Sequence, residues 1–397
     1  MVVLIISDYY SKNMGYSENM LPKYLSKLQL KVYVLSSEYN VYGNSELYKD
    51  IYEKFLGNAK QTLGITKVGR YILIRAASAH IYKYLYIKNL YKYLMAIKPD
   101  VVHCTEIGSI NFLIVFALKP FFKYRIFTES HQHYSVVAGY LKGDQFSLKD
   151  ALKKLFFIVT KKIPIAIASS KTEVCYAISE DCRMVASKLY GVDNSRIQIL
   201  PLGCDVDLFG ASSPQYDEVR IAYRLKMGYK QSDIVCIYTG RLSDDKNPLL
   251  LGQAIESLAI NNSNFHALFI GEGPQKAPLS ALKNCKVLDF LPHSELRNYY
   301  FCADLGVWPR QESMSMIDAM ASGMPILVSN EMGDKSRVIC TDQLFSPNDS
   351  LSLAEAIKRF ADMGFRHSIG RSSANLVVNR FNWLDIAAKI KMDYLKN

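Results

Sequence analysis

Long apolar runs are missing from this sequence, and their absence excludes a protein embedded in a membrane. The best apolar stretch, around Ile110 to Leu118, ends at Lys119, far short of the ~20 residues that cross a bilayer. The chain runs from Met1 straight into a strand-like segment, Val2 to Ile6, without a basic segment or a cleavage site, so no secretory signal is expected. These absences, with 21% charged residues, predict a globular protein of the cytoplasm.

Paired cysteines and the dinucleotide glycine fingerprint are missing as well. The eight cysteines have neither the close spacing of a metal site nor the density of a disulfide framework, so we expect reduced thiols. They are Cys104, Cys175, Cys182, Cys204, Cys236, Cys285, Cys302 and Cys340. No Gly-x-Gly-x-x-Gly follows the first strand, which argues against an NAD-linked oxidoreductase.

Acidic residues are scarce in the first half of the chain only. Residues 1–200 hold 27 basic and 15 acidic side chains, a net charge of +12, so the remainder carries −1 of the total of +11. Between Lys54 and Lys98 there are nine basic residues and no acidic one, interleaved with tyrosines and aliphatic residues. This pattern predicts an amphipathic helix on an anionic membrane surface, or alternatively a surface helix that packs its tyrosine rings on the domain.

A second basic and aliphatic stretch, residues 153–162, is another candidate for the membrane surface. Nucleic acid is not an expected partner, because no base-reading motif accompanies the charge. The charge asymmetry instead predicts that the first half meets an anionic lipid or a phosphorylated substrate.

The length of 397 residues and the element pattern predict two α/β domains. A strand at Val2 to Ile6, a loop with Gly15, a helix from Ser17 and a second strand from Lys31 are typical of a doubly wound sheet. Proline, glycine and small polar residues between Ile197 and residue 214 mark a hinge, after which a second strand and helix series begins.

Three strand ends in the second half carry groups suited to a phosphorylated ligand. Gly240, Arg241 and Lys246 follow one strand; Gly271 and Gly273 follow another; Ser313, Ser315 and Asp318 follow a third, at the start of a helix. Carboxyl ends of parallel strands share one edge, so two cations, a helix N-terminus and a carboxylate are expected around a sugar nucleotide. Alternatively, the cations pair with Asp244 and Asp245, and the helix is merely capped and packed.

Together these motifs resemble family 4 (group 1) retaining glycosyltransferases with the GT-B fold. The matching segments are Thr239-Gly-Arg-Leu, Lys246-Asn-Pro, Gly271-Glu-Gly-Pro, Ile317-Asp-Ala-Met-Ala-Ser-Gly-Met-Pro and the hinge Ile199-Leu-Pro-Leu-Gly-Cys-Asp205. The first half resembles the family more loosely, at Gly15, Pro99-Asp-Val-Val-His103 and the strand end Thr128 to His131.

The resemblance implies two Rossmann-like α/β domains that face each other across a cleft. Residues 1–203 would bind the acceptor, residues 204–380 the nucleotide-sugar donor, and a helix in 381–397 would cross back to the first domain. The implied reaction moves a hexose-type sugar, with retention and without a metal or cofactor, from a nucleoside diphosphate to a hydroxyl of a glycan or lipid-linked glycan. The enzyme would work at the inner face of the cell membrane.

Site residues follow from the same resemblance. Arg241 and Lys246 would bind the diphosphate, and His131, with His133 as a competitor, would meet the donor sugar. Asp318 would bind the ribose hydroxyls. The implied donor-binding residues are Gly15, Gly240, Gly271, Gly273, Phe290, Leu291, Glu312, Ser313, Met314, Ser315, Met316 and Asp318.

One position departs from the family pattern of two glutamates eight residues apart. Eight residues before Asp318 stands Arg310, and Glu312 is two residues out of register. Either Glu312 replaces the acid through a different loop path, or the donor sugar is recognised differently. A nucleotide-sugar epimerase or hydrolase on a similar fold, or a non-catalytic binding protein, are the alternative functions.

Overall fold

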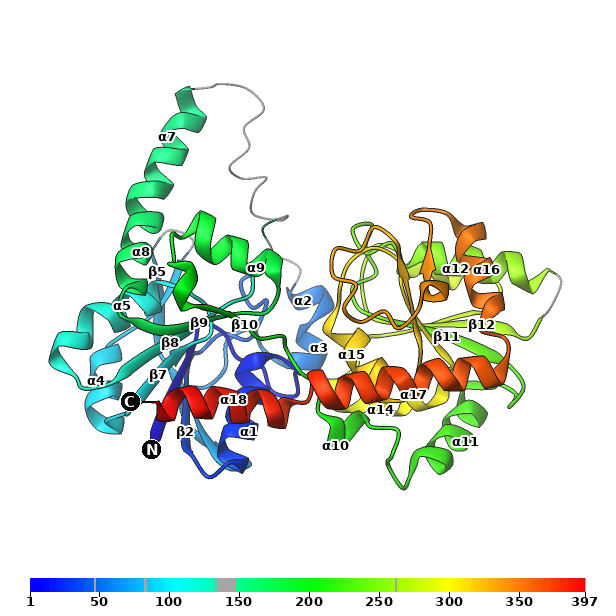
Figure 1. Ribbon diagram of the computed structural model, residues 1–397, viewed down its shortest axis with the longest axis horizontal. Coiled ribbons are helices and arrows are strands. Elements are labelled where there is room, and N and C mark those ends of the chain that lie inside the picture. The colour runs from blue at the N-terminus through cyan, green and yellow to red at the C-terminus, as the bar shows by residue number, and fades with distance from the viewer. Residues whose placement is uncertain (46–47, 82–83, 133, 135–147, 261–262, 397) are drawn as a thin grey trace. The chain divides into compact units, whose positions relative to one another are not determined.

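The computed structural model covers residues 1–397 and describes all of them except 46–47, 82–83, 133, 135–147, 261–262 and 397 (Figure 1). The chain forms two compact units, each built around its own sheet. The first unit comprises Met1–Lys12, Tyr16–Leu202 and Leu384–Asn397, and the second comprises Asn13–Gly15 and Gly203–Trp383.

The first unit holds an eight-stranded sheet in the order β10-β9-β8-β7-β1-β2-β4-β3. Its strands are β1 (Val2–Ser7), β2 (Lys31–Ser37), β3 (Gly64–Val68), β4 (Tyr71–Ala76), β7 (Val101–Cys104), β8 (Arg125–Ser130), β9 (Thr172–Ala177) and β10 (Ile197–Ile199). All neighbours run parallel except β3, which is antiparallel to β4. The central strands are almost wholly buried, as expected when both faces of a parallel sheet are covered.

The prediction of one amphipathic helix across residues 54–98 is wrong. Short helices α3 (Glu53–Leu56) and α4 (Leu90–Ile97) flank β3, β4 and the separate hairpin of β5 (Ser78–Ile81) and β6 (Tyr84–Ile87). The aromatic and β-branched residues from Tyr71 onward form β4 instead, paired with β2 and buried through Leu73 and Ile74. Pairing with β2 makes residues 71–76 a strand, although the charge pattern predicted a helix.

Arg75 explains why the charge pattern misled. Its side chain is buried, and the guanidinium donates hydrogen bonds to the carbonyl oxygens of Ser37 (3.2 Å), Tyr39 (3.1 Å) and Tyr10 (2.7 Å). A cation that satisfies backbone oxygens inside the unit does not belong to a membrane-facing surface. Among the described residues, no helix combines the length and apolar character that crossing a bilayer requires.

The second unit holds a six-stranded parallel sheet in the order β13-β12-β11-β14-β15-β16. Its strands are β11 (Ile234–Thr239), β12 (Phe265–Ile270), β13 (Cys285–Leu288), β14 (Leu305–Trp308), β15 (Ile326–Ser329) and β16 (Leu344–Phe345). Helices α11 (Tyr216–Met227), α12 (Leu249–Ala259), α13 (Lys276–Ser280), α14 (His293–Cys302), α15 (Met314–Ala321), α16 (Ser350–Arg359) and α17 (Met363–Arg380) accompany it. This strand order reverses between β11 and β14, where doubly wound sheets bind ligands.

The C-terminal helix α18 (Trp383–Leu395) returns the chain to the first unit (Figure 1). The ammonium of Lys391 donates to the carbonyl oxygen of Leu28 (2.9 Å), at the end of α1 (Ser17–Lys27), and Tyr176 donates to Asp393 (2.8 Å). The prediction of two doubly wound α/β sheets with a returning C-terminal helix is therefore confirmed.

Candidate functional site

Three glycines bring the loops after β11 and β12 into backbone contact. Gly240, Gly271 and Gly273 have φ angles of 147°, 155° and 150°, which disfavour any side chain. A Cβ built on Gly271 would lie 1.9 Å from the carbonyl oxygen of Gly240, and one on Gly273 would lie 2.4 Å from that of Leu242. The N–H of Leu242 donates to the carbonyl oxygen of Glu272 (2.8 Å). The glycines thus let two strand-end loops pack closely at one rim of the sheet.

The start of α15 joins the same rim through hydroxyl groups. Ser313 is the N-cap, and its hydroxyl lies 2.7 Å from that of Ser315. Ser315 Oγ donates to the carbonyl oxygen of Thr239 (3.1 Å), the last residue of β11, which also accepts from the indole of Trp308 (3.2 Å). Met314, Ser315 and Met316 form the first turn of α15, whose N–H groups lack intrahelical acceptors.

Lys246 and Arg241 differ in their surroundings. The ammonium of Lys246 donates to the carbonyl oxygen of Glu312 (3.3 Å), so it reaches the loop that precedes α15. Burial, followed by the charge of Arg241, lowers the pKa of Lys246. The Arg241 side chain is 57% exposed and its Nη2 lies 3.1 Å from Oδ2 of Asp245. The predicted cations therefore belong to one loop, but Arg241 makes the alternative ion pair and Lys246 reaches toward the helix.

Glu312 is held by the loop after β15 and by a cation that the sequence interpretation missed. Its Oε1 accepts from the N–H of Asp334 (3.1 Å), and its Oε2 lies 3.9 Å from Nη2 of Arg337. Arg337 also donates to the carbonyl oxygen of Ser313 (3.1 Å), and burial lowers its pKa. The available signal was the polar run that follows β15, another strand end at the same rim.

Arg310, at the position of the expected acid, connects two loops. It donates to the carbonyl oxygen of Asp244 (3.0 Å) and to Oδ1 of Asn348 (2.9 Å). Its guanidinium therefore supports the loop that carries Lys246.

The side chain of Asp318 is buried and not freely accessible to a ligand. It is 3% exposed, and its Oδ2 lies 2.8 Å from Nε2 of His293. The thiol of Cys204, whose pKa is raised by burial and by Asp318, borders the same carboxylate. The side chain is thus on the inner side of α15, below the turn that carries the serines.

The remaining donor-binding candidates of the second unit are partly buried. Phe290 and Leu291 lie in the segment between β13 and α14. Gly15 groups with this unit, where a Cβ would lie 2.5 Å from Cε1 of His293, and the N–H of His293 donates to the carbonyl oxygen of Asn13 (3.1 Å). Close packing, rather than a turn alone, requires glycine at position 15.

His131, in the first unit, follows β8 and hydrogen-bonds through Nε2 to Oε2 of Glu129. Glu129 is 4% exposed, and its Oε1 lies 2.9 Å from Nε2 of His103. The competing candidate, His133, lies outside the described residues. Sequence inspection singled out His131 but assigned no role to Glu129.

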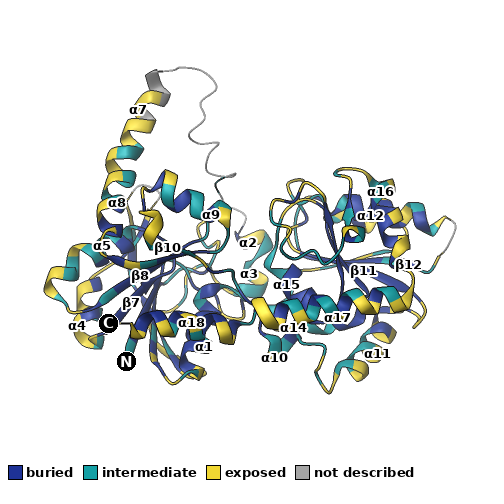
Figure 2. Ribbon diagram, viewed as in Figure 1, coloured by how far each residue is buried: buried dark blue, intermediate teal, exposed yellow. Residues whose placement is uncertain are grey.

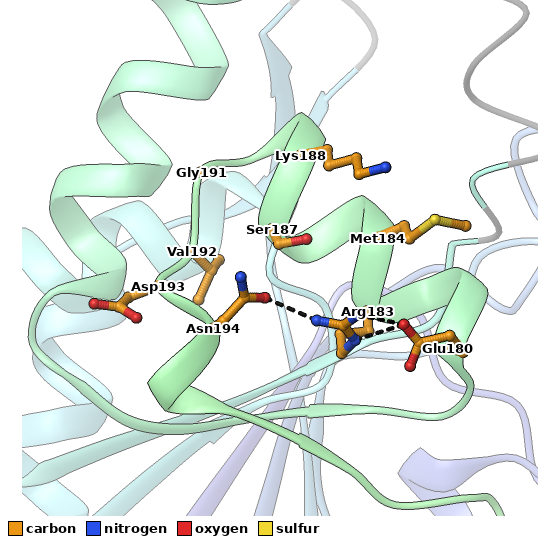
Figure 3. A pocket seen from close by; sticks show the side chains of 9 residues that line it. All are labelled: Glu180, Arg183, Met184, Ser187, Lys188, Gly191, Val192, Asp193 and Asn194. Carbon is orange, nitrogen blue, oxygen red and sulfur yellow. Dashed lines mark hydrogen bonds and ion pairs between the residues drawn. The ribbon is translucent and has the colours of Figure 1, made fainter.

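A hollow of about 480 Å³ on the first unit contains none of the predicted site residues (Figure 3). Residues of α9 (Glu180–Met184), of the π-helix Val185–Leu189 and of residues 191–194 line it. Arg183 lies across it, bonded to Glu180 and to Oδ1 of Asn194 (2.9 Å) (Figure 3). The guanidinium of Arg183 is thus bound by other residues of the hollow. In the described part of the chain, no group of three or more His, Cys, Asp or Glu side chains is arranged so that it could hold a metal ion.

Comparison with known families gives two matches along the chain. Residues 22–208 match the family model described as Glycosyltransferase Family 4, and residues 220–375 match the one described as Glycosyl transferases group 1. The first match covers most of the first unit and ends at residue 208, just inside the second unit, and the second match lies within the second unit.

Individual proteins agree with these matches. The chain is 30% identical over 206 residues to the putative teichuronic acid biosynthesis glycosyltransferase TuaC of Bacillus subtilis, covering 49% of this chain and 48% of that protein. It is 24% identical over 265 residues to the UDP-Gal:alpha-D-GlcNAc-diphosphoundecaprenol alpha-1,3-galactosyltransferase of Escherichia coli, covering 63% and 67%. The chain thus spans about half of the first relative and two thirds of the second.

A solved structure extends the similarity to the whole fold. Anabaena Alr3699/HepE, determined in complex with UDP, superimposes with a TM-score of 0.68 over 99% of both chains, at 15% identity. At that identity the comparison establishes the shared fold.

Proposed function

Because the chain belongs to the family 4 (group 1) glycosyltransferases, we propose that it transfers a hexose-type sugar from a nucleoside diphosphate to a hydroxyl group. The reaction would retain the anomeric configuration and need no metal. The observation that carries the proposal is the contact of Lys246 with the carbonyl oxygen of Glu312, which brings a cation to the first turn of α15. A diphosphate there would meet an ammonium and helix N–H donors together.

The lowered pKa of Lys246 fits this role. A partly desolvated ammonium without a full counter-charge gains more from an arriving phosphate than a solvated one does. In the transition state the leaving nucleotide gains negative charge, which Lys246, Arg241 and the amides from Glu312 to Met316 would stabilise. In this proposal Asp318 binds the ribose and the backbone at Phe290 and Leu291 meets the base. His131 contacts the donor sugar.

UDP is the donor nucleotide that the relatives favour. The Anabaena structure contains UDP, and the Escherichia coli relative is named for a UDP-Gal donor. The same relative is named for a diphosphoundecaprenol acceptor, which supports a lipid-linked glycan as acceptor for this chain. We therefore assign acceptor binding to the basic first unit and donor binding to the second.

An exposed apolar surface on the first unit supports a lipid-linked acceptor. We define the apolar stripe as Leu152, Leu155, Phe156, Val159, Ile163 and Ile167, whose side chains are all between 49% and 64% exposed. They follow α7 (Leu148–Phe157), the π-helix Ile158–Lys162 and α8 (Ile163–Ser169) at helical spacing, and Figure 2 shows α7 largely exposed. Lys154 on the same helix is exposed and adds positive charge.

Such a surface is suited to bind an anionic bilayer, because its apolar side chains insert into the bilayer while its lysines contact the lipid phosphates. We propose that the enzyme docks peripherally on the inner face of the cell membrane through this stripe. Residues 54–98 no longer support docking, because they form strands and short helices.

Donor binding is tested by thermal stabilisation with UDP-hexoses, and turnover by transfer to a panel of lipid-linked acceptors. Lys246→Ala should abolish the diphosphate-dependent rise in Tm, while Lys283→Ala, an exposed lysine before β13, should keep it. Stabilisation without transfer to any acceptor would favour the non-catalytic binding protein. Free sugar or an epimer formed without acceptor would favour the hydrolase or epimerase.

Docking is tested by co-sedimentation with vesicles of anionic and of neutral lipid. The double variant Leu155→Ser, Phe156→Ser should lose binding to anionic vesicles. Leu225→Ser, which removes a 79% exposed apolar side chain from the second unit, should not. Equal binding to neutral vesicles, or none to either kind, would contradict the docking proposal.

A further inference from the structure

A buried chain of hydrogen bonds in the first unit ends at His131, and Glu129 lies at its centre. Oε1 of Glu129 is 2.9 Å from Nε2 of His103, and Nδ1 of His103 is 2.5 Å from the hydroxyl of Tyr394 on α18. The hydroxyl of Ser17, the first residue of α1, donates to both carboxylate oxygens (3.0 and 2.8 Å). Side chains of β7 and α1 therefore meet at the carboxylate on β8, and α18 is joined to it through His103.

The chemistry of Glu129 fixes the direction of the bond to His103. An ionised carboxylate only accepts, so Nε2 of His103 donates to Oε1 of Glu129. Burial raises the pKa of Tyr394 well above its ordinary value, so the phenol at Nδ1 of His103 keeps its proton. Burial opposes the charge on Glu129, but hydrogen bonds from His103 and His131 hold the pKa of that carboxyl well below its usual range. Glu129 is thus an ionised acceptor on every side.

Glu129 orients the ring of His131 through a hydrogen bond and favours its protonated form. Burial alone would lower its pKa, but the hydrogen bond and charge of Glu129, with the charges of Glu106 and Glu18, raise it. The charged groups that act on the ring are therefore Glu129 on β8, Glu18 on α1 and Glu106 after β7. Lys161 in turn interacts with the charges of Glu106 and of Asp8, which follows β1.

We propose that Glu129 is a positioning residue that binds Nε2 of His131 and so presents Nδ1 to the substrate. The bonds through His103 to Tyr394 fix the carboxylate and make the seating of α18 part of the site. When it is protonated, the ring offers Nδ1–H as a cationic donor, which suits a sugar hydroxyl or a phosphate oxygen. The identity of that substrate rests on the proposed function; the orientation of the ring does not.

The first test reads the ring itself and needs no activity. With ¹⁵N-labelled histidine, the seven imidazoles are titrated by NMR, and His131→Gln identifies the signal of interest. In Glu129→Gln the His131 pKa should fall by about one unit or more, because the bonded carboxylate is gone. Glu106→Gln, which acts through charge only, should cause a smaller fall, and Glu173→Gln, an exposed carboxylate on β9, none.

An unchanged His131 titration in a folded Glu129→Gln variant would overturn the proposal. Should that variant fail to fold, Ser17→Ala provides the test instead. It removes a hydrogen-bond donor from Glu129, so the carboxylate interacts more strongly with His131. The His131 pKa should therefore rise. A fall or no change would again contradict the positioning role.

The second test reads catalysis. Glu129→Gln should lower kcat far more than it changes the donor KM, and should shift the pH profile of kcat/KM by the amount seen in the NMR titration. Tyr394→Phe, which reaches Glu129 only through His103, should cause a smaller shift. If no transfer is observed with any acceptor, the proposed function fails while the NMR result still decides the role of Glu129.

Discussion

Nε2 of His293 lies 2.8 Å from Oδ2 of Asp318, and the carboxylate is only 4% exposed. The sequence predicts that Asp318 binds ribose hydroxyls, and in the structure its carboxylate faces the His293 ring at the start of α14. One oxygen engaged with His293 leaves the other to accept from a hydroxyl, because a carboxylate has about four acceptor sites. The contact thus orients Asp318 for such a bond and also ties α15 to α14.

Asp318→Asn should weaken UDP-hexose binding about tenfold, because a hydrogen bond to a charged acceptor becomes one to a neutral amide. Isothermal titration calorimetry with UDP and with UDP-hexose measures the effect. His293→Gln is the matched control: it keeps a donor beside the carboxylate and should change affinity less. A lower Tm with unchanged affinity in Asp318→Asn would assign the residue a structural role only.

Arg241 and Asp245 form a second pair whose role can be tested. Their side chains are 57% and 42% exposed, so the pair itself contributes little stability. A donor diphosphate would compete with Asp245 for the guanidinium. Asp245→Asn should therefore tighten UDP binding by no more than about fivefold, the scale of an exposed ion pair.

The double variant separates this effect from that of Lys246, which also feels Asp245. In an Arg241→Ala background, Asp245→Asn should no longer tighten UDP binding. Tightening that persists there would show that Asp245 acts through Lys246 instead. Calorimetric titration of the four proteins completes the cycle.

Gly271 provides a prediction about the rim. Gly271→Ala should destabilise the second unit by roughly 2–4 kcal/mol, because the new Cβ would collide with the carbonyl oxygen of Gly240 in addition to straining the backbone. Gly228→Ala is the control: φ is 70°, but the nearest atom is the end of a flexible lysine at 3.5 Å, so only the strain of about 1 kcal/mol applies. Thermal unfolding compares the two, and equal costs would contradict the packing argument.

Much of the second unit was accessible from sequence, because its determinants are local. The glycines with φ near 150° and the serine N-cap are recognisable in the sequence directly after predicted strands, and they predicted the loops at the rim. The burial of Asp318 was not accessible, since it depends on His293, which lies 25 residues away in another element. Arg337 was missed for a similar reason: its partners Glu312 and Ser313 come from a different loop.

The first unit was harder to predict because its pairing is less local. Residues 71–76 became a strand through contact with β2, about 40 residues earlier, and a charge pattern says nothing about such pairing. Likewise, Glu129 lies only two residues before His131 in the sequence, but its role depends on distant segments. His103 binds its carboxylate, and Tyr394 binds His103.

Glu18 yields a prediction about stability and pH. Burial raises its pKa from 4.5 to about 7, with nearby Glu129 adding to the effect and His131 opposing it. The folded state therefore binds the proton more tightly than the unfolded state does, and stability falls as the pH rises from about 4.5 to about 7.

Replacing the carboxyl with an amide should remove this loss. Glu18→Gln should stabilise the protein by about 1–2 kcal/mol at pH 8, an allowance made for partial exposure of the side chain, and by almost nothing at pH 4.5. Denaturant unfolding at both pH values measures the difference. Glu173→Gln, an exposed carboxylate of the same unit, should show no such pH dependence. A constant effect of Glu18→Gln at the two pH values would mean that the side chain contributes through packing and not through its ionisation.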